Sequence, residues 1–180
     1  TGKTQETQNA AKACAEMLNQ YKTVIVYDPV DLKLMLHEYK EWGIEITAKV
    51  VGLNEYLLAL IENGKLAVKK TANEYTLQDN YAYARELDDS ETGRKLIEKV
   101  GLNKEMLLIA KEANLAGQLI MAEYMPDVIV QVAKDRWQNA INMDCKTMVT
   151  ENPAEYVALK ATAPDGYRVI SVEEMLLENM

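Results

Sequence analysis

The chain contains an internal repeat, and this repeat constrains its fold more than any other feature of the sequence. Residues 22–35, KTVIVYDPVDLKLM, align without a gap on residues 146–159, KTMVTENPAEYVAL. In this alignment Asp28 matches Asn152 and Pro29 matches Pro153. Because a repeated segment normally folds as a repeated supersecondary unit, the sequence predicts two related units.

The similarity extends beyond these runs, since residues 43–64 resemble residues 166–180. The pattern of each copy therefore predicts the element order helix, strand, helix, strand and helix. Strands that alternate with helices favour small parallel sheets flanked by helices, so we expect an α/β fold with the two units related by a pseudo-twofold arrangement.

The two copies are unequal in length. Residues 65–125 have no counterpart ahead of Thr1. We therefore expect residues 1–68 to be the back half of a first repeat, incomplete at its N-terminus, and residues 69–180 to be a whole second repeat. This pattern suggests a fragment of a longer protein.

Composition limits the class of protein. The 180 residues are 48% hydrophobic and 27% charged, enough to build the core of one compact domain or two small ones. No apolar run approaches the roughly 20 residues of a membrane helix and no leader is visible, which predicts a cytoplasmic protein without a transmembrane segment. A net charge of −8 without a basic cluster argues against nucleic acid as a partner.

The repeated turn has the composition of a helix start. Asp28 and Asn152 fit the N-cap position, the following prolines fit N1, and Asp31 and Glu155 fit N3. Cap side chains accept hydrogen bonds from free amides of the first turn, and an acidic N3 residue can bond back to the cap. The turns therefore need no catalytic role to explain them.

The same turns resemble a known family. YDPVDLKLML and TENPAEYVALK resemble the C-P-x-C turn of the cysteine-rich CCG domain, which occurs in tandem in heterodisulfide reductase subunits. Related iron–sulfur subunits of glycolate oxidase, glycerol-3-phosphate dehydrogenase and lactate-utilisation proteins share this domain. YTLQDNYAYAREL resembles the segment with a His-Asp-Pro-Cys turn, of which only Asp79 is retained, and residues 114–117 take the place of the double cysteine. The prolines of the C-P-x-C pattern are kept, and every cysteine is replaced.

The resemblance implies a degenerate member of this family. The positions that match its cluster ligands are Asp28, Asp31, Tyr81, Asn114, Leu115, Asn152 and Glu155. Iron–sulfur clusters are held chiefly by thiolates, so we expect no cluster, no other cofactor, no metal and no catalytic residue in this segment. The implied role is a scaffold or subunit-contact region of an electron-transfer complex, with other subunits or domains of a redox complex as partners.

Two alternatives concern the same turns. Oxygen ligands at Asp28 and Asp31, or at Asn152 and Glu155, could hold Mg²⁺ or Ca²⁺, although each pair alone supplies too few ligands. A cavity lined by Tyr81, Tyr83 and Asn152 could instead bind a small molecule. A working oxidoreductase with an altered site is the corresponding enzyme hypothesis.

The remaining chemically reactive side chains form no motif. Cys14 and Cys145 belong to no C-x-x-C pair. We expect Cys14 on a buried helix face, whereas Cys145 follows a helix end and could be exposed and reactive. His37 is the sole histidine and cannot supply a metal site by itself.

Two segments give specific structural expectations. Residues 106–110 form a short, continuously apolar run, for which we expect a strand buried on both faces rather than part of one long helix over residues 103–124. Residues 127–141 carry apolar positions at helical spacing, which predicts a helix with Trp137 in the core.

Overall fold

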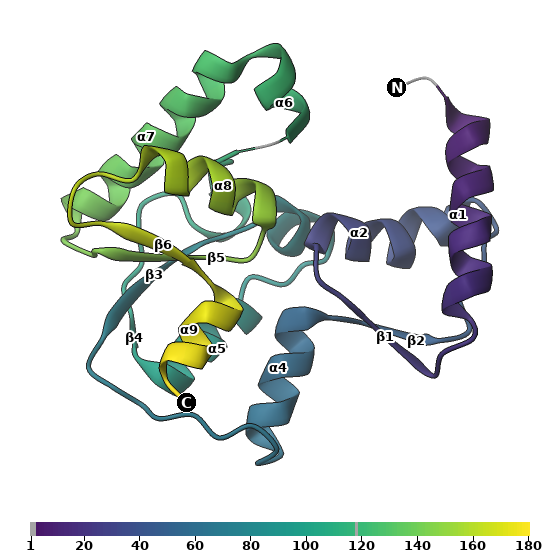
Figure 1. The fold of residues 1–180 in the computed structure, drawn as a ribbon, viewed down its shortest axis with the longest axis horizontal. Helices are drawn as coiled ribbons and strands as arrows, with labels where there is room; N and C mark the ends of the chain where they lie inside the picture. Colours follow the sequence, from purple (N-terminus) through teal and green to yellow (C-terminus); the bar gives the residue numbers. More distant parts are fainter. Residues whose placement is uncertain (1–2, 118) are drawn as a thin grey trace.

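The protein consists of two α/β units, each built on a parallel sheet (Figure 1). The computed structural model describes residues 3–117 and 119–180, so Thr1 and Gly2 of the predicted first unit lie outside the described residues. One sheet has two strands in the order β1-β2, and the other has four in the order β4-β3-β5-β6. Helices flank both sheets, which confirms the predicted fold class.

The first unit contains one strand pair and the helices around it. A π-helical turn, η1, joins α2 and α3 into one continuous helical segment, and the register of the strands pairs Thr23 with Lys49 and Val26 with Gly52. The elements are α1 (Thr4–Leu18), β1 (Thr23–Val26), α2 (Pro29–Lys33), η1 (Leu34–Glu38), α3 (Tyr39–Glu41), β2 (Lys49–Gly52) and α4 (Leu53–Glu62).

The second unit is larger. Its elements are β3 (Glu74–Gln78), η2 (Ala82–Glu86), α5 (Thr92–Val100), β4 (Leu102–Asn103), η3 (Ala110–Glu112), α6 (Leu119–Tyr124), α7 (Pro126–Asn142), β5 (Thr147–Thr150), α8 (Pro153–Thr162), β6 (Arg168–Ser171) and α9 (Val172–Glu178). No helix in the described part of the chain has both the length and the apolar character needed to cross a membrane.

The sequence repeat is also a structural repeat. Strand β1 corresponds to β5 at the offset found in the sequence, and each pairs in parallel with the strand of its own copy, β2 or β6. In the order along the chain α1 corresponds to α7, α2 to α8, and α4 to α9. The second unit adds β3, β4 and α5, for which the first unit has no equivalent among the described residues.

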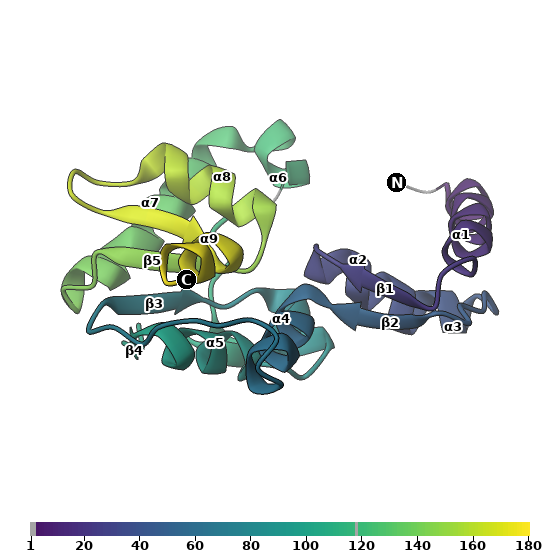
Figure 2. The same cartoon turned by 60° about the horizontal axis from the view of Figure 1, so that its bottom comes forward.

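Helices lie on both faces of the four-stranded sheet (Figure 2), and the main core packs between these helices and the sheet. On one face Tyr75 and Leu77 pack with Leu96 of α5 and Met175 of α9. On the other face Trp137 of α7 packs with apolar residues of β5 and α8. The indole nitrogen of Trp137 donates to the Leu159 carbonyl oxygen at 2.9 Å, which confirms Trp137 as a core residue.

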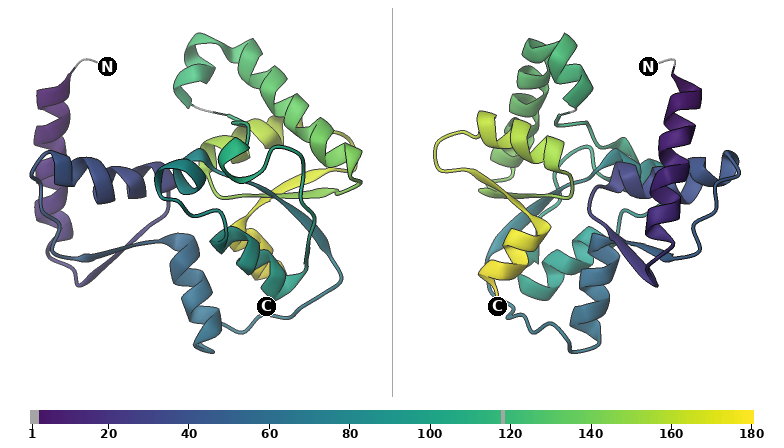
Figure 3. Two further views of the ribbon diagram at one scale, coloured as in Figure 1. Left: turned by 180° about the vertical axis from the view of Figure 1, so that it is seen from behind. Right: turned by 45° about the vertical axis from the view of Figure 1, so that its right-hand side comes forward.

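The two units meet through helix starts and strand ends, and α1 lies at the far end of the molecule from the four-stranded sheet (Figure 3). Tyr83 of η2 packs with Val26 of β1 and Leu32 of α2 in one buried cluster. Tyr83 therefore belongs to the junction between the units.

The strand predicted at residues 106–110 is wrong. The edge strand of the sheet is the two-residue β4, and residues 106–109 are irregular. Leu108 and Ala110 have φ of 58° and 51°, which a β-strand cannot accommodate. Leu107 is 70% exposed, so the apolar run is not buried on both faces. One long helix over residues 103–124 is not present either, since η3 and α6 are separate and short.

Other expectations have mixed outcomes. Helix α7 matches the predicted helix at residues 127–141. Cys145 is buried rather than exposed, and Cys14 is only partly buried. His37 lies in η1 and is exposed.

Candidate functional site at the carboxyl ends of the strands

Polar side chains gather where β3 and β5 end. Gln78 closes β3 and is followed by Asp79 and Asn80, and all three are at most 2% exposed. Glu151 and Asn152 follow β5. The carboxyl ends of parallel strands meet at one edge of a sheet, which is where open α/β sheets usually place their sites.

The repeated turns cap their helices as predicted. The Asp28 carboxylate accepts from the Val30 amide at 2.8 Å, and the Asn152 side-chain oxygen accepts from the amides of Ala154 and Glu155 at 2.9 and 3.1 Å. The two caps also touch, because Nδ2 of Asn152 donates to Oδ1 of Asp28 at 3.3 Å. This contact brings equivalent residues of the two copies together.

One part of the capping prediction is wrong. Neither Asp31 nor Glu155 bonds back to its cap residue; the capping box among the described helices is formed by Ser171 and Glu174 at the start of α9. Glu155 turns inward instead. Burial and then the nearby Asp28 charge raise the pKa of Asp31, whose side chain is not part of the buried cluster.

Glu155 is the centre of the cluster and is 1% exposed. Its Oε1 accepts from Nε2 of Gln78 and from the Ala116 amide, both at 3.1 Å, and its Oε2 accepts from Nδ2 of Asn80 at 3.2 Å. Burial raises the pKa of Glu155 to about 7, although these donors act in the opposite direction. Since protein donors occupy both oxygens, the carboxylate acts as an internal cross-link between strand ends.

Glu151 forms a second link, this time between the units. Its Oε1 accepts from Nδ2 of Asn54 in α4 at 2.7 Å, and its Oε2 accepts from the Asn80 amide at 3.4 Å. Burial, and then the charge of Asp79, raise the pKa of Glu151 to about 8. Beside it lies a small pocket of about 10 Å³, room for about one water molecule.

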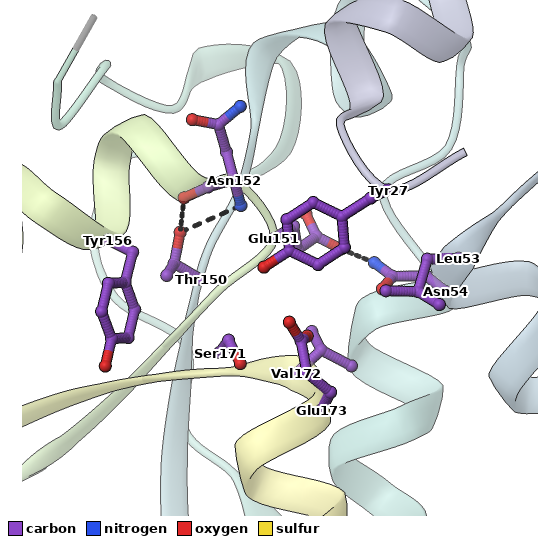
Figure 4. A pocket seen from close by; sticks show the side chains of 10 residues that line it. All are labelled: Tyr27, Leu53, Asn54, Thr150, Glu151, Asn152, Tyr156, Ser171, Val172 and Glu173. Carbon is purple, nitrogen blue, oxygen red and sulfur yellow. Dashed lines mark hydrogen bonds between the residues drawn. The ribbon is translucent and has the colours of Figure 1, made fainter. Parts of the chain in front are cut away.

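Figure 4 shows the side chains around this pocket. Tyr27 of the first unit extends across Glu151, while Ser171 and Glu173 approach from the start of α9. The Thr150 hydroxyl accepts from the Asn152 amide at 3.3 Å and donates to the Asn152 carbonyl oxygen at 3.4 Å. The pocket is polar but too small for an organic ligand.

Two buried arginines donate hydrogen bonds to side chains of the cluster. Arg94 of α5 forms paired hydrogen bonds with Asp79, at 2.6 and 2.9 Å, and with Glu105, at 2.8 and 3.0 Å. Arg136 of α7 donates to the side-chain oxygen of Gln78 and to the Leu107 carbonyl oxygen. Burial lowers the pKa of Arg136, and its Nη2 has no partner among the described residues. The sequence did not predict these roles, because isolated arginines in amphipathic helices normally face solvent.

The structure brings most of the seven predicted positions together. Asp28, Asn152 and Glu155 belong to the cluster described above, and Asn114 joins it through its carbonyl oxygen, which accepts from Gln78 at 2.9 Å. Burial is the main cause that raises the pKa of Tyr81. The Lys33 charge lowers this pKa, and the charges of Asp28 and Glu155 raise it.

Two positions lie outside this group. Leu115 lines an open hollow together with Asn114, Arg85 and Val132, on the side of α7. Asp31 is exposed on α2. Among the described residues, no group of three or more His, Cys, Asp or Glu side chains is arranged to hold a metal ion.

Comparisons with known proteins give little further information. No protein-family profile matches the chain, and no curated protein matches it. A crystal structure of the glutamate racemase isoform RacE1 from Bacillus anthracis aligns with 16% sequence identity and a TM-score of 0.39, over 99% of this chain and 64% of that one. The chain thus spans less than two thirds of that structure, and a TM-score this low carries no argument about function.

Proposed function

We propose that this chain is a degenerate CCG-domain region of a heterodisulfide reductase-like iron–sulfur oxidoreductase, and that it serves as a scaffold or subunit-contact part of an electron-transfer complex. The observation that carries this proposal is the convergence of Asp28, Asn114, Asn152 and Glu155, which come from distant segments of the sequence and are joined by hydrogen bonds, in part through Gln78. Four of the seven positions that matched family ligands by pattern are therefore neighbours in space.

The residues now at these positions do not fit an iron–sulfur cluster. They offer carboxylate, amide and phenol groups in place of the thiolates that clusters require. Cys145 precedes β5 and so lies at the opposite end of that strand from Asn152, and Cys14 lies in α1. Glu155 fills the centre with its own hydrogen bonds to Gln78 and Ala116. A closed network of this kind suits a structural role.

The proposal is tested by iron and acid-labile sulfide analysis of the protein purified and reconstituted without oxygen, with a metal scan of the same sample. We expect iron, sulfide and other metals near zero. Stoichiometric iron with sulfide would refute the loss of the cluster. Mg²⁺ or Ca²⁺ in stoichiometric amount would instead favour a binding site at the Asp28 or Asn152 turn.

A second candidate is an oxidoreductase domain with an altered site, and one observation favours it. Glu151 and Glu155 have pKa values of about 8 and 7, in the range useful for proton transfer near neutral pH. Their oxygens face protein donors, however, and the adjacent pocket holds about one water. Binding of a redox substrate that Glu151→Gln abolishes would support this candidate over the scaffold.

A further inference from the structure

A hollow of about 170 Å³ lies in the first unit, between strand β2 and the helical segment formed by α2, η1 and α3. It is at the end of the molecule where α1, α3 and β2 lie, away from the four-stranded sheet (Figure 2). The apolar side chains that line it are Met35, Leu36, Ile44, Ile46, Ala48 and Val50. The scaffold role proposed above does not use this hollow.

Half of its lining comes from a segment that is longer in the first copy of the repeat. Gly43 and Gly166 occupy equivalent turns, with φ of 68° and 79°. Residues 44–48 separate Gly43 from β2, whereas Tyr167 alone separates Gly166 from β6. Because the shorter connection of the second copy has no room for such a wall, the hollow is specific to the first copy.

Hydrogen bonds hold this longer segment in place. Nδ2 of Asn19, at the end of α1, donates to the Glu45 carbonyl oxygen at 3.1 Å. Oδ1 of Asn19 accepts from the Thr47 amide at 2.7 Å. The backbone is thus fixed on both sides of Ile46, and the wall is formed before any ligand binds, as is usual for small-molecule sites.

The second unit fills the equivalent place with an aromatic side chain. Met35 corresponds to Leu159, whose carbonyl oxygen accepts from the indole nitrogen of Trp137. Val50 corresponds to Val169 in the register of the strands, and Val169 belongs to the same core cluster as Trp137. An indole ring therefore covers this end of β6.

In the first unit the position of Trp137 holds a small residue. Helices α1 and α7 end at Leu18 and Asn142, at the offset of the repeat, so Ala13 takes the place of Trp137. Ala13 is exposed, and Val50 is only partly buried. An apolar cavity of about 150 Å³ can hold benzene, so the size of the hollow suits one aromatic ring with a small substituent.

Two charged side chains indicate the polar group of the ligand. Lys40 of α3 and Glu45 both line the hollow, and both are exposed, which places them at its mouth. A hydroxyl group can accept from Lys40 while it donates to Glu45. A carboxylate would be repelled by Glu45 and an ammonium group by Lys40. The pair therefore favours a neutral hydroxyl group.

We propose that this hollow is a binding site for a single-ring aromatic molecule with one hydroxyl group, of which phenol is the smallest. The ring occupies the apolar space beside Val50, and the hydroxyl group meets Lys40 and Glu45. This inference goes beyond the scaffold role and does not depend on it.

The test uses the 180-residue chain with labelled methyl groups, followed by NMR during a titration with phenol. A bound aromatic ring shifts the resonances of the methyl groups that it contacts. We expect saturable shifts for Ile46, Ala48 and Val50, and none for the exposed Val128 of α7. Benzene lacks the hydroxyl group and should bind about tenfold more weakly.

Protein variants supply the matched controls. Ala48→Leu fills the hollow and should weaken phenol binding by about tenfold or more, whereas Thr47→Leu, at the exposed neighbouring position, should leave it unchanged. Val50→Ile is a smaller filling change that serves if Ala48→Leu does not fold. Lys40→Met should remove the advantage of phenol over benzene and leave benzene binding unchanged.

Three results would overturn the proposal: no saturable shift at the lining methyl groups, phenol binding that survives the filling variants, or equal affinities of the wild type for phenol and benzene. The seven positions that match family ligands do not line this hollow. The outcome therefore leaves the iron and sulfide analysis untouched, and the two proposals fail separately.

Discussion

Glu155 makes the stability of this protein depend on pH in an unusual direction. Burial raises its pKa from the ordinary value of 4.5 to about 7 in the folded protein. The folded state therefore binds more protons than the unfolded state between these values, and stability falls as pH rises through this window. A carboxyl group in an ordinary ion pair has the opposite effect, because its pKa is lowered on folding.

The size of the effect follows from the pKa shift. One unit corresponds to about 1.4 kcal/mol, so the raised pKa of Glu155 costs about 3 kcal/mol of stability by pH 8, relative to pH 4. Glu155→Gln removes this titration and keeps the shape of the side chain, but it turns an amide donor toward Gln78, Asn80 or Ala116. The variant should therefore be less stable than the wild type at pH 5, and the difference should shrink by about 2.5 kcal/mol between pH 5 and pH 8.

Urea denaturation at pH 5, 6, 7 and 8 measures this difference, with tryptophan fluorescence, to which Trp42 and the buried Trp137 contribute, as the signal. The contributions of titrating groups distant from Glu155 are common to both proteins and cancel in the comparison. Glu151 is the exception, because the Glu155 charge also raises its pKa, and Glu151→Gln in both proteins removes this contribution. A constant difference in free energy of unfolding from pH 5 to pH 8 would refute the reasoning. A wild type that gains stability over the variant as pH rises would also refute it.

Two further predictions concern the contacts around Glu155. Asn152→Asp keeps the helix cap but places a second carboxylate opposite Asp28, so the variant should be destabilised at pH 7 and recover below pH 4, as measured by urea denaturation. Arg94→Met leaves the buried Asp79 and its neighbour Glu105 without their cation, and it should lower the free energy of unfolding by about 3–5 kcal/mol.

Each of these variants has a control in the same chain. Asp28→Asn combined with Asn152→Asp exchanges the two caps and removes the repulsion, so it should restore stability at pH 7. Arg168→Met breaks an exposed pair with Glu178 and should cost much less than Arg94→Met. Equal losses in the two arginine variants would contradict the role assigned to Arg94.

The features that could be predicted from the sequence are those with a short-range physical cause. The Asp-Pro and Asn-Pro turns predicted two helix starts, because cap preference and the missing proline donor act within one turn. The repeat predicted the parallel pairing of β1 with β2 and of β5 with β6. It also predicted that the two turns would occupy equivalent places, which the contact between Asp28 and Asn152 agrees with.

The features that could not be predicted from the sequence depend on contacts between segments that are distant along the chain. The apolar run at residues 106–110 has the composition of a buried strand, but Arg136 takes the Leu107 carbonyl oxygen and the backbone turns left-handed at Leu108. Glu155 was predicted to cap its own helix, yet donors from β3 and residue 116 attract it inward. Three consecutive polar residues, Gln78 to Asn80, begin at the last position of β3, and this run was the sequence signal available for the cluster.

The central proposal is that the seven predicted positions derive from a former cluster site, although Asp31 and Leu115 now lie apart from the others, and restoring cysteines to all seven tests it most directly. The seven-cysteine variant, with Asp28, Asp31, Tyr81, Asn114, Leu115, Asn152 and Glu155 replaced, would be reconstituted with iron and sulfide without oxygen. The wild type and a variant with seven cysteines at exposed sites would be treated in parallel. The account predicts bound iron and sulfide in the first variant alone. A folded seven-cysteine variant without iron, or a wild type that binds iron and sulfide in stoichiometric amount, would contradict it.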